Sequence, residues 1–448
     1  MGTTLLILLN KLVTMVCKMF KKQASVYPGS IVLPFNHHIL DKLKYPELVI
    51  CVTGSSGKGS TTSLLAHILS DNGYKVVWNS SGSNHENAVT TLLLNNTNAF
   101  THKVNADCVL LEMDESYLRV AFKKNQFTHI VITNVTRDQV ARNGAPEIVL
   151  KKLINQTLDT NAHLIINADD PLVNQFTLHH KGPITTYGLA KNKYSLTKPI
   201  NHNVDGAYCP VCHTKLKYTC YHYGHLGVYA CPKNDFQRKT DYEAKNIDLE
   251  KSQMQINDQK IHLNKNVFFA AYYTLAAYTL CKTIGMKEKD ILKSINVNIL
   301  PSKRGKILKL DDREINMLES KNENNLSYYQ SLKYINQHPD TKTIILGFDN
   351  VSRRYKYNDL SWIYDIDFEM IDTSKVSRIF VIGRFRFDVA ARLINAGLDE
   401  DKILLVEEIG DIKTLLRENS SGTIFTMVCF DMTEILKKLL LAGDEDEN

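Results

Sequence analysis

The sequence predicts an α/β protein with two domains, each built on a mostly parallel sheet. Strand-like apolar runs alternate with helical patterns from residue 47 to residue 190, which is typical of a doubly wound sheet. A glycine-rich turn joins the first of these strands to the helix that follows it. A second alternation begins beyond residue 301. We therefore expect an N-terminal helical or extended segment over residues 1–44, a central domain over residues 45–300 and a C-terminal domain over residues 301–448, with a boundary around residues 299–302.

The N-terminal segment contains an apolar run, Leu5–Val13, that Asn10 and Lys11 interrupt and that three further lysines follow. The run is shorter than the roughly 18 apolar residues that a membrane-spanning helix requires. We expect a basic amphipathic helix instead. Such a helix either packs on the body of the protein or lies on a membrane surface, and packing is the favoured alternative.

The central domain is predicted to contain five strands, with helices at Thr62–Asp71 and Glu147–Thr157. Ligands of doubly wound sheets bind at the carboxyl ends of the strands. The polar residues that follow each strand are therefore candidates for a binding site. The strands are expected at Leu48–Thr53, Lys75–Trp78, Cys108–Met113, His129–Thr133 and His163–Asn167.

The turn after the first strand has the composition of a phosphate-binding loop. Backbone N–H groups and the positive end of the next helix would face the anion, and Lys58 would reach the outer phosphates. A hydroxyl directly after the lysine usually holds Mg²⁺, but Gly59 stands there. The alternative is a glycine–serine turn without a ligand. The residues expected to bind nucleotide are Gly54, Ser55, Ser56, Gly57, Lys58, Gly59, Ser60 and Thr61.

Polar side chains at the ends of the next strands extend this site. Glu112 ends the third strand, where a carboxylate can face a cation, and we expect it to bind Mg²⁺ together with Ser60 or Thr61. Four further residues are expected to seat nucleotide or metal, with turn and cap roles as the alternative. These four are Asn134, Asp138, Asn167 and Asp169.

A segment rich in tyrosine, histidine and cysteine interrupts the alternation at residues 200–240. Cys209 and Cys212 form a C-x₂-C knuckle, and Cys231 follows, as in a zinc ribbon whose fourth cysteine is missing. The alternative is a metal-free hairpin held by tyrosine and leucine packing. The fourth ligand stays open between Cys220, our first choice, and His222 or His225.

The C-terminal domain is predicted as a smaller, Rossmann-like α/β unit. A largely buried helix over residues 266–283 precedes it, and a helix is expected at Asp388–Ala396. Residues 443–448 form an acidic tail. The strands are expected at Thr343–Leu346, Arg378–Ile382, Ile403–Val406 and Ile424–Val428.

Composition narrows the classes of function. The formal net charge is only +6, and no block of lysine and arginine interleaved with aromatic residues occurs, which argues against nucleic-acid binding. Apart from a cluster at residues 209–231, the nine cysteines of the chain are scattered, which favours a cytoplasmic protein with reduced thiols over a disulfide scaffold.

Three of these features together resemble the Mur ligase superfamily. They are the phosphate-binding loop, Asn79–Asn84 and Asn167–Pro171. Others narrow the resemblance to the family of MurT-type ligase subunits of lipid II isoglutaminyl synthase. These are Glu112–Ser116 with Thr133–Gln139, the cysteine-bearing insertion, and the run Asp359–Glu369. The resemblance runs from about Pro28 to the last strand, and it implies a Mur-ligase-like central domain with an inserted zinc-ribbon-like hairpin.

The resemblance implies an ATP-dependent carbon–nitrogen ligase that also uses Mg²⁺, with Zn²⁺ in the ribbon. Its acceptor would be the α-carboxylate of D-glutamate in lipid II, activated as an acyl phosphate and amidated by ammonia. A GatD-type glutaminase would supply that ammonia in a heterodimer with this chain. Lys58 and Glu112 would serve phosphoryl transfer, whereas Asp359 would complete the Cys–His pair of the partner. Such an enzyme would work in the cytoplasm, at the inner face of the cell membrane.

The chain also departs from the family pattern. Gly59 replaces a threonine of the loop, Ala141 replaces an aspartate, and the fourth ribbon cysteine is missing. Two alternatives stay open for this reason. One is a folylpolyglutamate-synthase-like or other Mur-type ligase that joins an amino acid by itself. The other is a degenerate nucleotide-binding scaffold without ligase activity.

Overall fold

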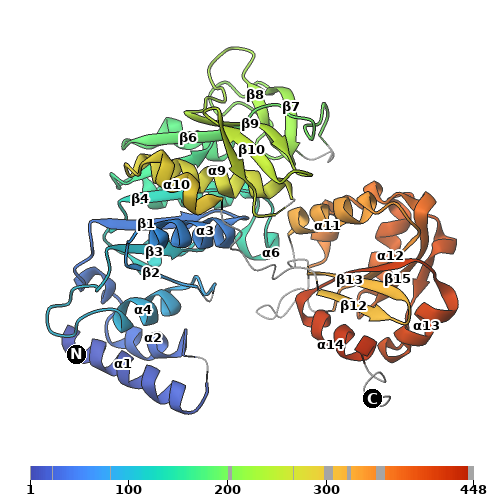
Figure 1. Cartoon of the computed structure of the whole chain (residues 1–448), viewed down its shortest axis with the longest axis horizontal. Coiled ribbons are helices and arrows are strands. Elements are labelled where there is room, and N and C mark those ends of the chain that lie inside the picture. The colour runs from blue at the N-terminus through green and yellow to red at the C-terminus, as the bar shows by residue number, and fades with distance from the viewer. Residues whose placement is uncertain are drawn as a thin grey trace. The chain divides into compact units, whose positions relative to one another are not determined.

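The computed structural model describes residues 2–22, 24–80, 82–199, 204–265, 267–296, 306–319, 324–349 and 359–441. The chain divides into two compact units (Figure 1). The first holds Met1–Thr136 and Ala145–Leu300, and the second holds Arg137–Gly144 and Pro301–Asn448. Residues 299–302, where the sequence places the domain boundary, and the acidic tail at residues 443–448 lie outside the described residues.

Nine strands of the described residues form one sheet in the first unit, in the order β11-β10-β9-β6-β5-β4-β1-β3-β2. In this order, all neighbouring strands between β9 and β2 pair in parallel, and β10 and β11 add an antiparallel edge beside β9. Parallel strands that helices cover on both faces have continuous apolar sequences, because both faces are buried. Strand β1 is an example, since five of its six residues are buried. The bounds are β1 (Leu48–Thr53), β2 (Val76–Trp78), β3 (Cys108–Glu112), β4 (His129–Ile132), β5 (His163–Asn167), β6 (Ile184–Leu189), β9 (Tyr242–Asp248), β10 (Gln253–Ile256) and β11 (Gln259–His262).

The helices of this unit fall into two groups. Helix α9 packs on α3 and α10 and on the strands around β6, whereas α1, α2 and α4 pack on one another near the N-terminus (Figure 1). A separate hairpin, β7 (Lys217–Tyr223) with β8 (Leu226–Ala230), lies within the cysteine-bearing insertion. The helices are α1 (Thr3–Met19), α2 (Tyr27–Val32), α3 (Lys58–Asp71), α4 (Glu86–Asn95), α5 (Leu118–Ala121), α7 (Pro146–Thr157), α8 (Phe176–His179), α9 (Phe268–Thr283) and α10 (Glu288–Ile295).

The N-terminal helix α1 packs on the body of the first unit, which confirms the favoured alternative. Leu6 and Ile7 are fully buried in the same core as Val49 of β1. Asn10 is also buried, and its side-chain amide donates to the Asn95 side-chain oxygen at 2.9 Å. Residues 1–44 are therefore part of the first unit and do not form a body of their own.

The second unit is a six-stranded sheet in the order β12-β13-β17-β14-β15-β16, parallel except for β12, as far as the chain is described. Two apolar cores contain residues of this sheet, and the α/β prediction is confirmed. The strands are β12 (Lys306–Leu310), β13 (Arg313–Glu319), β14 (Lys342–Gly347), β15 (Val376–Ile382), β16 (Ile403–Leu405) and β17 (Thr423–Val428). The helices are α6 (Val140–Asn143), α11 (Asn325–Gln337), α12 (Arg386–Asn395), α13 (Ile412–Asn419) and α14 (Phe430–Leu441).

Candidate functional site

The predicted phosphate-binding loop joins β1 directly to α3, which begins at Lys58. Gly57 has a φ of 85° and Gly54 a φ of 121°, a region of backbone conformation that favours glycine. A Cβ atom on Gly54 would lie 2.3 Å from the Thr133 hydroxyl oxygen and 2.8 Å from the Asn134 carbonyl oxygen. The turn therefore needs glycine at position 54, and its N–H groups precede a 14-residue helix whose positive end favours an anion.

The residues after β4 hold this loop in place. The Ser55 N–H donates to the Asn134 carbonyl at 2.9 Å. The Asn134 side chain accepts from the Ser56 N–H at 3.0 Å and donates to the Ser56 carbonyl at 2.9 Å. Because both ends of its amide bind the loop, Asn134 fixes the conformation of the loop.

Lys58 is buried at the first position of α3. Its ammonium donates to the Gly54 carbonyl and to the Glu115 carboxylate, the latter at 3.0 Å. The two side chains of this ion pair are only 10% and 6% exposed. The ion pair of Glu115 with Lys58 was not predicted from the sequence. The one sequence feature that pointed to Glu115 was its position three residues after Glu112, near the end of the same strand. A phosphate at the loop would compete with Glu115 for the lysine.

Glu112 lies at the end of β3, beside the first turn of α3. A Cβ atom on Gly59 would lie 3.2 Å from a carboxylate oxygen of Glu112, so the missing side chain leaves room for this carboxylate. The Asn79 side chain holds the Glu112 backbone through two hydrogen bonds of 2.8 Å, one to its N–H and one to its carbonyl. A carboxylate at this strand end suits a hard cation such as Mg²⁺.

The two hydroxyls proposed to bind Mg²⁺ differ in accessibility. The Thr61 side chain is fully buried and donates to the Gly57 carbonyl at 2.9 Å. Ser60 is partly exposed. The structure therefore favours Ser60 over Thr61 as the companion of Glu112.

Asn167 and Asp169, after β5, lie in a buried polar network. The Asn167 side chain donates to the Thr133 carbonyl at 3.0 Å, and the Asp169 N–H donates back to the Asn167 side chain at 3.1 Å. The Asp169 carboxylate accepts from Arg238 at 2.5 Å and from the Tyr272 hydroxyl at 2.8 Å. These partners fit the structural alternative for Asn167 and Asp169 better than direct contact with nucleotide.

Asp138 lies on residues 137–144, which belong to the second unit. Its backbone forms an isolated antiparallel bridge with Asn324, and its carbonyl accepts from the Asn143 side chain at 3.0 Å. Its role toward nucleotide stays a prediction.

Replacing Asp169 with asparagine is expected to destabilise the protein by about 3–5 kcal/mol, because Arg238 would lose its fully buried partner and keep only the partly exposed Glu243. Urea unfolding measures this change. Glu243→Gln is the matched control, since Glu243 also pairs with Arg238 but is 28% exposed and should contribute less than about 1 kcal/mol. Normal stability of Asp169→Asn together with lost nucleotide binding would instead make Asp169 a ligand.

The two histidines of the hairpin contact the ends of two neighbouring strands, His222 at the end of β6 and His225 after β5. The His222 ring binds the Leu189 carbonyl at 2.8 Å through Nε2 and the Ser195 hydroxyl at 3.0 Å through Nδ1. The His225 ring binds the Asp170 carboxylate at 3.1 Å. Burial lowers the pKa of His222, whereas for His225 burial is outweighed by Asp170, so that its pKa is raised. Neither histidine is placed to bind a metal with the cysteines.

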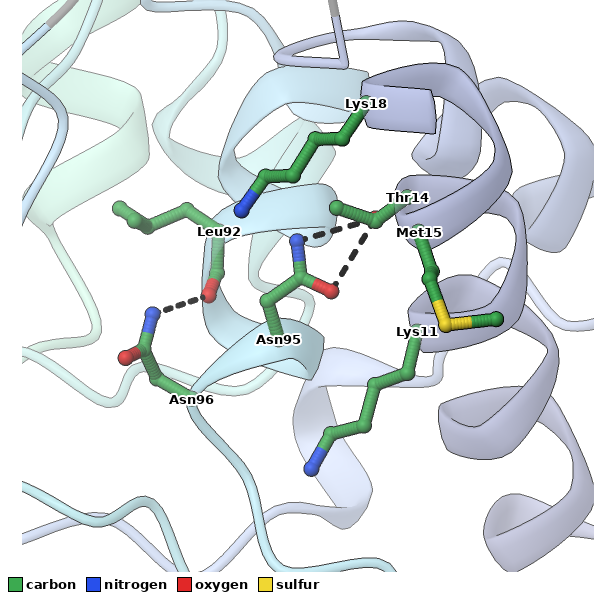
Figure 2. Close-up of a pocket in the computed structure, with 7 residues that line it drawn as sticks. All are labelled: Lys11, Thr14, Met15, Lys18, Leu92, Asn95 and Asn96. Carbon is green, nitrogen blue, oxygen red and sulfur yellow. Dashed lines mark hydrogen bonds between the residues drawn. The ribbon is translucent and has the colours of Figure 1, made fainter. Parts of the chain in front are cut away.

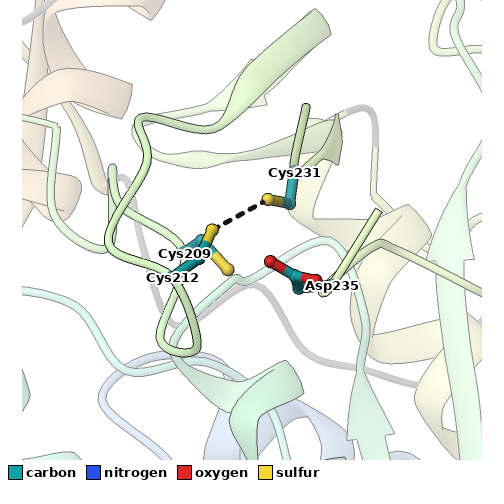
Figure 3. A group of neighbouring side chains, drawn as sticks. All are labelled: Cys209, Cys212, Cys231 and Asp235. Atoms are coloured by element: carbon teal, nitrogen blue, oxygen red, sulfur yellow. Dashed lines mark hydrogen bonds between the residues drawn. The ribbon is translucent and has the colours of Figure 1, made fainter. Parts of the chain in front are cut away.

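The three predicted cysteine ligands do come together. Figure 3 shows Cys209, Cys212 and Cys231 around a common centre with the Asp235 carboxylate. The ligand atoms of these four residues all lie within 4.8 Å of one another, and the Cys212 and Cys231 sulfurs are 3.4 Å apart. Backbone N–H groups of Val211 and Lys233 donate to the Cys209 and Cys231 sulfurs at 3.4 Å, which stabilises thiolates.

The prediction of Cys220 as the fourth ligand is wrong. Cys220 lies inside β7, whereas Cys231 follows Ala230, the residue that pairs with Lys217 at the start of β7. Three residues of strand separate these positions by roughly 10 Å. Asp235 takes the fourth place, and three thiolates with one carboxylate form a donor set that suits tetrahedral Zn²⁺.

Replacing Asp235 with alanine is expected to weaken zinc binding by at least about tenfold, because a four-coordinate site loses one ligand. Titration with a chelator and metal analysis measure this change. Cys209→Ser should weaken binding in the same way, and Cys220→Ser should not. Zinc loss only in Cys220→Ser would contradict the assignment, and a metal-free wild-type chain would favour the metal-free hairpin.

The run Asp359–Glu369 of the second unit is mostly structural. Trp362, Ile363 and Phe368 are buried in its core. Asp365 pairs with Arg137 at 2.9 Å, and Glu369 pairs with Arg392 at 2.8 Å. Burial, with the nearby Glu369 carboxylate, raises the pKa of Asp367 to about 7, so this acid is partly protonated at neutral pH.

Asp359 differs from the other acids of this run. It is exposed, and one carboxylate oxygen accepts from the Ser361 N–H at 2.9 Å. That hydrogen bond fixes the side chain in a turn directly before the short helix Ser361–Asp365, whose N-cap residue is Leu360. An exposed, oriented carboxylate also remains available to a partner chain.

Two family models match this chain. The family model of the Mur ligase middle domain matches residues 52–230, and that of the MurT ligase C-terminal region matches residues 321–430. The chain is 26% identical over 387 residues to the lipid II isoglutaminyl synthase (glutamine-hydrolyzing) subunit MurT of Staphylococcus aureus (strain COL). This match covers 86% of each of the two chains. It is 27% identical over 390 residues to the same subunit of Streptococcus pneumoniae (strain ATCC BAA-255 / R6), covering 85% of this chain and 84% of that protein.

Among solved structures, the fold is similar to that of a pseudomurein peptide ligase type C from Methanothermus fervidus. The TM-score is 0.64 at 19% identity, and the match covers 89% of this chain and 79% of the other. The two matched family models show that the chain belongs to the Mur ligase superfamily. Within that superfamily it is of the MurT type, and it is accordingly a Mur-type ATP-dependent ligase.

Proposed function

We propose that this chain is the ligase subunit of a lipid II isoglutaminyl synthase. In this proposal it converts the α-carboxylate of D-glutamate in lipid II to an acyl phosphate with ATP, and ammonia then displaces the phosphate. One observation carries the proposal: Lys58 and Glu112 flank the start of α3 in a chain whose C-terminal region is of the MurT type. The names of the similar MurT subunits support the choice of lipid II and glutamine.

A carboxylate needs activation because its charge repels nucleophiles and oxide is a poor leaving group. Phosphoryl transfer depends mainly on positioning and on stabilisation of charge. The N–H groups of the loop and the Lys58 ammonium would bind the β- and γ-phosphates of ATP. Asn134 and Thr133 would keep the loop in the required conformation through their contacts with Ser56.

Glu112 and Ser60 fit a Mg²⁺ ion, since the Glu112 carboxylate lies beside Gly59 in the first turn of α3 and the next residue, Ser60, is partly exposed. When bound, Mg²⁺ would neutralise negative charge on the phosphates. Gly59 leaves room for the Glu112 carboxylate, so the loss of the loop threonine is compatible with cation binding.

We infer that a GatD-type glutaminase supplies ammonia and that the two chains form a heterodimer. Asp359 is our candidate for the acid that orients the catalytic histidine of that partner and stabilises its cation. Since the proposed acceptor is lipid-linked, the complex would work in the cytoplasm at the inner face of the cell membrane.

An amidation assay tests this proposal. The chain is mixed with a GatD-type glutaminase, lipid II, ATP and glutamine, and the products are followed by mass spectrometry. We expect amidated lipid II and ADP, both dependent on lipid II. Ligation of a free amino acid without the partner would favour another Mur-type ligase, and absence of ATP binding would favour the scaffold alternative.

A further inference from the structure

Helix α1 has a second apolar face that no other part of the described chain covers. One face, with Leu6, Ile7 and Cys17, packs into the first unit. The other is exposed, and its residues recur at the three- and four-residue spacing of a helix. Met19 is 71% exposed and Phe20 65%. The exposed apolar residues are Leu5, Leu8, Leu12, Met15, Val16, Met19 and Phe20.

Lysines border this face. Lys11 and Lys18 line an open pocket of about 550 Å³ between α1 and the end of α4, and Figure 2 shows them on the two sides of Asn95. Lys21 and Lys22 follow directly after the helix. The first forty residues contain these four lysines and neither aspartate nor glutamate.

The exposed apolar residues and the lysines beside them together indicate which kind of surface covers this face of α1. Interfaces between proteins are depleted in lysine and enriched in aromatic residues, methionine and arginine. The exposed face has two methionines and one phenylalanine, but no arginine, and lysines border it. An apolar helix face of leucine, methionine and a terminal phenylalanine with lysines along its border is typical of helices that lie in a membrane interface. Lysine side chains can extend from such a face to the headgroup phosphates.

We propose that the exposed face of α1 binds the surface of an anionic phospholipid bilayer. Leu12, Met15 and Met19 enter the boundary between headgroups and acyl chains, and Lys18 and Lys22 contact lipid phosphates. The helix lies on the bilayer, because its opposite face is fixed to the protein. No helix of the described residues is long and apolar enough to cross a membrane. This contact does not depend on the proposed reaction, although it would hold the chain where a lipid-linked acceptor is found.

Vesicle sedimentation of the full chain tests the proposal. We expect binding to vesicles of phosphatidylcholine mixed equally with phosphatidylglycerol, and at least about tenfold weaker binding to phosphatidylcholine alone. Met15→Gln with Met19→Gln preserves helix propensity and should weaken binding by at least about tenfold. Lys18→Gln with Lys22→Gln should remove the dependence on anionic lipid and on salt.

The matched control is Phe100→Gln, which removes an 80% exposed aromatic side chain elsewhere in the first unit and should leave vesicle binding unchanged. Amidation of detergent-dissolved lipid II should also be unchanged in both double variants, which separates this proposal from the proposed reaction. Absence of vesicle binding by the wild-type chain, or binding that neither double variant reduces, would overturn it. The proposal would also be overturned if the methionine double variant disrupts self-association or glutaminase binding instead of vesicle binding.

Discussion

Replacing Lys58 with alanine is expected to lower the rate of lipid II amidation by at least about 10²–10³-fold, because the charge that faces the transferred phosphate is lost. Initial rates with either glutamine or ammonium as the nitrogen source measure this effect, and both should fall equally. Retained activity would remove Lys58 from the mechanism.

The buried ion pair complicates this substitution and also suggests its control. Lys58→Ala leaves the Glu115 carboxylate buried without its cation, which should destabilise the fold by about 3–5 kcal/mol. The double variant Lys58→Met with Glu115→Gln removes both charges and should recover most of that stability. If its activity recovers together with its stability, the lysine acts only through the fold.

Replacing Asp359 with asparagine is expected to lower glutamine-driven amidation by at least about 10²-fold, because an amide neither stabilises a histidine cation nor fixes its tautomer. Amidation driven by ammonium should be unchanged, since Asp359 is assigned to the histidine of the partner and not to phosphoryl transfer. The ratio of the two rates is the measurement.

Asp365→Asn is the matched control in the same run of sequence. Asp365 forms an ion pair with Arg137 inside the second unit, so its loss should lower stability without changing the ratio of the two rates. Equal loss of both activities in Asp359→Asn would contradict a role across the interface with the partner and leave only the contact with the Ser361 N–H.

The backbone of the predicted phosphate-binding loop could be predicted because its requirements are local. Gly54 and Gly57 adopt conformations that favour glycine, and the order of strand, turn and helix follows from a short stretch of sequence. The place of Glu112 followed from the rule that parallel strands end at one edge of a sheet. The ion pair between Lys58 and Glu115 was not predicted, because their distance depends on how β3 lies beside β1.

Long-range contacts limited the rest of the prediction. Asp169 looked like a ligand because its partners, Arg238 and Tyr272, lie 69 and 103 residues away in the sequence. The sequence pattern favoured cysteine or histidine as the fourth zinc ligand, whereas the turn after Cys231 brings the carboxylate of Asp235 to the cluster. Strands β9 to β11 were missed because their polar, half-exposed sequences lack a continuous apolar run.

The fate of one oxygen atom tests the central claim, that ATP at the Lys58 loop phosphorylates a carboxylate of lipid II. Lipid II is prepared with oxygen-18 in the α-carboxylate of its D-glutamate and is amidated by the complex. If the carboxylate attacks the γ-phosphorus and ammonia then breaks the C–O bond, one labelled oxygen leaves with inorganic phosphate. Mass spectrometry of the phosphate should therefore find the label there. Amidation that yields unlabelled phosphate, or label in AMP, would contradict the claim.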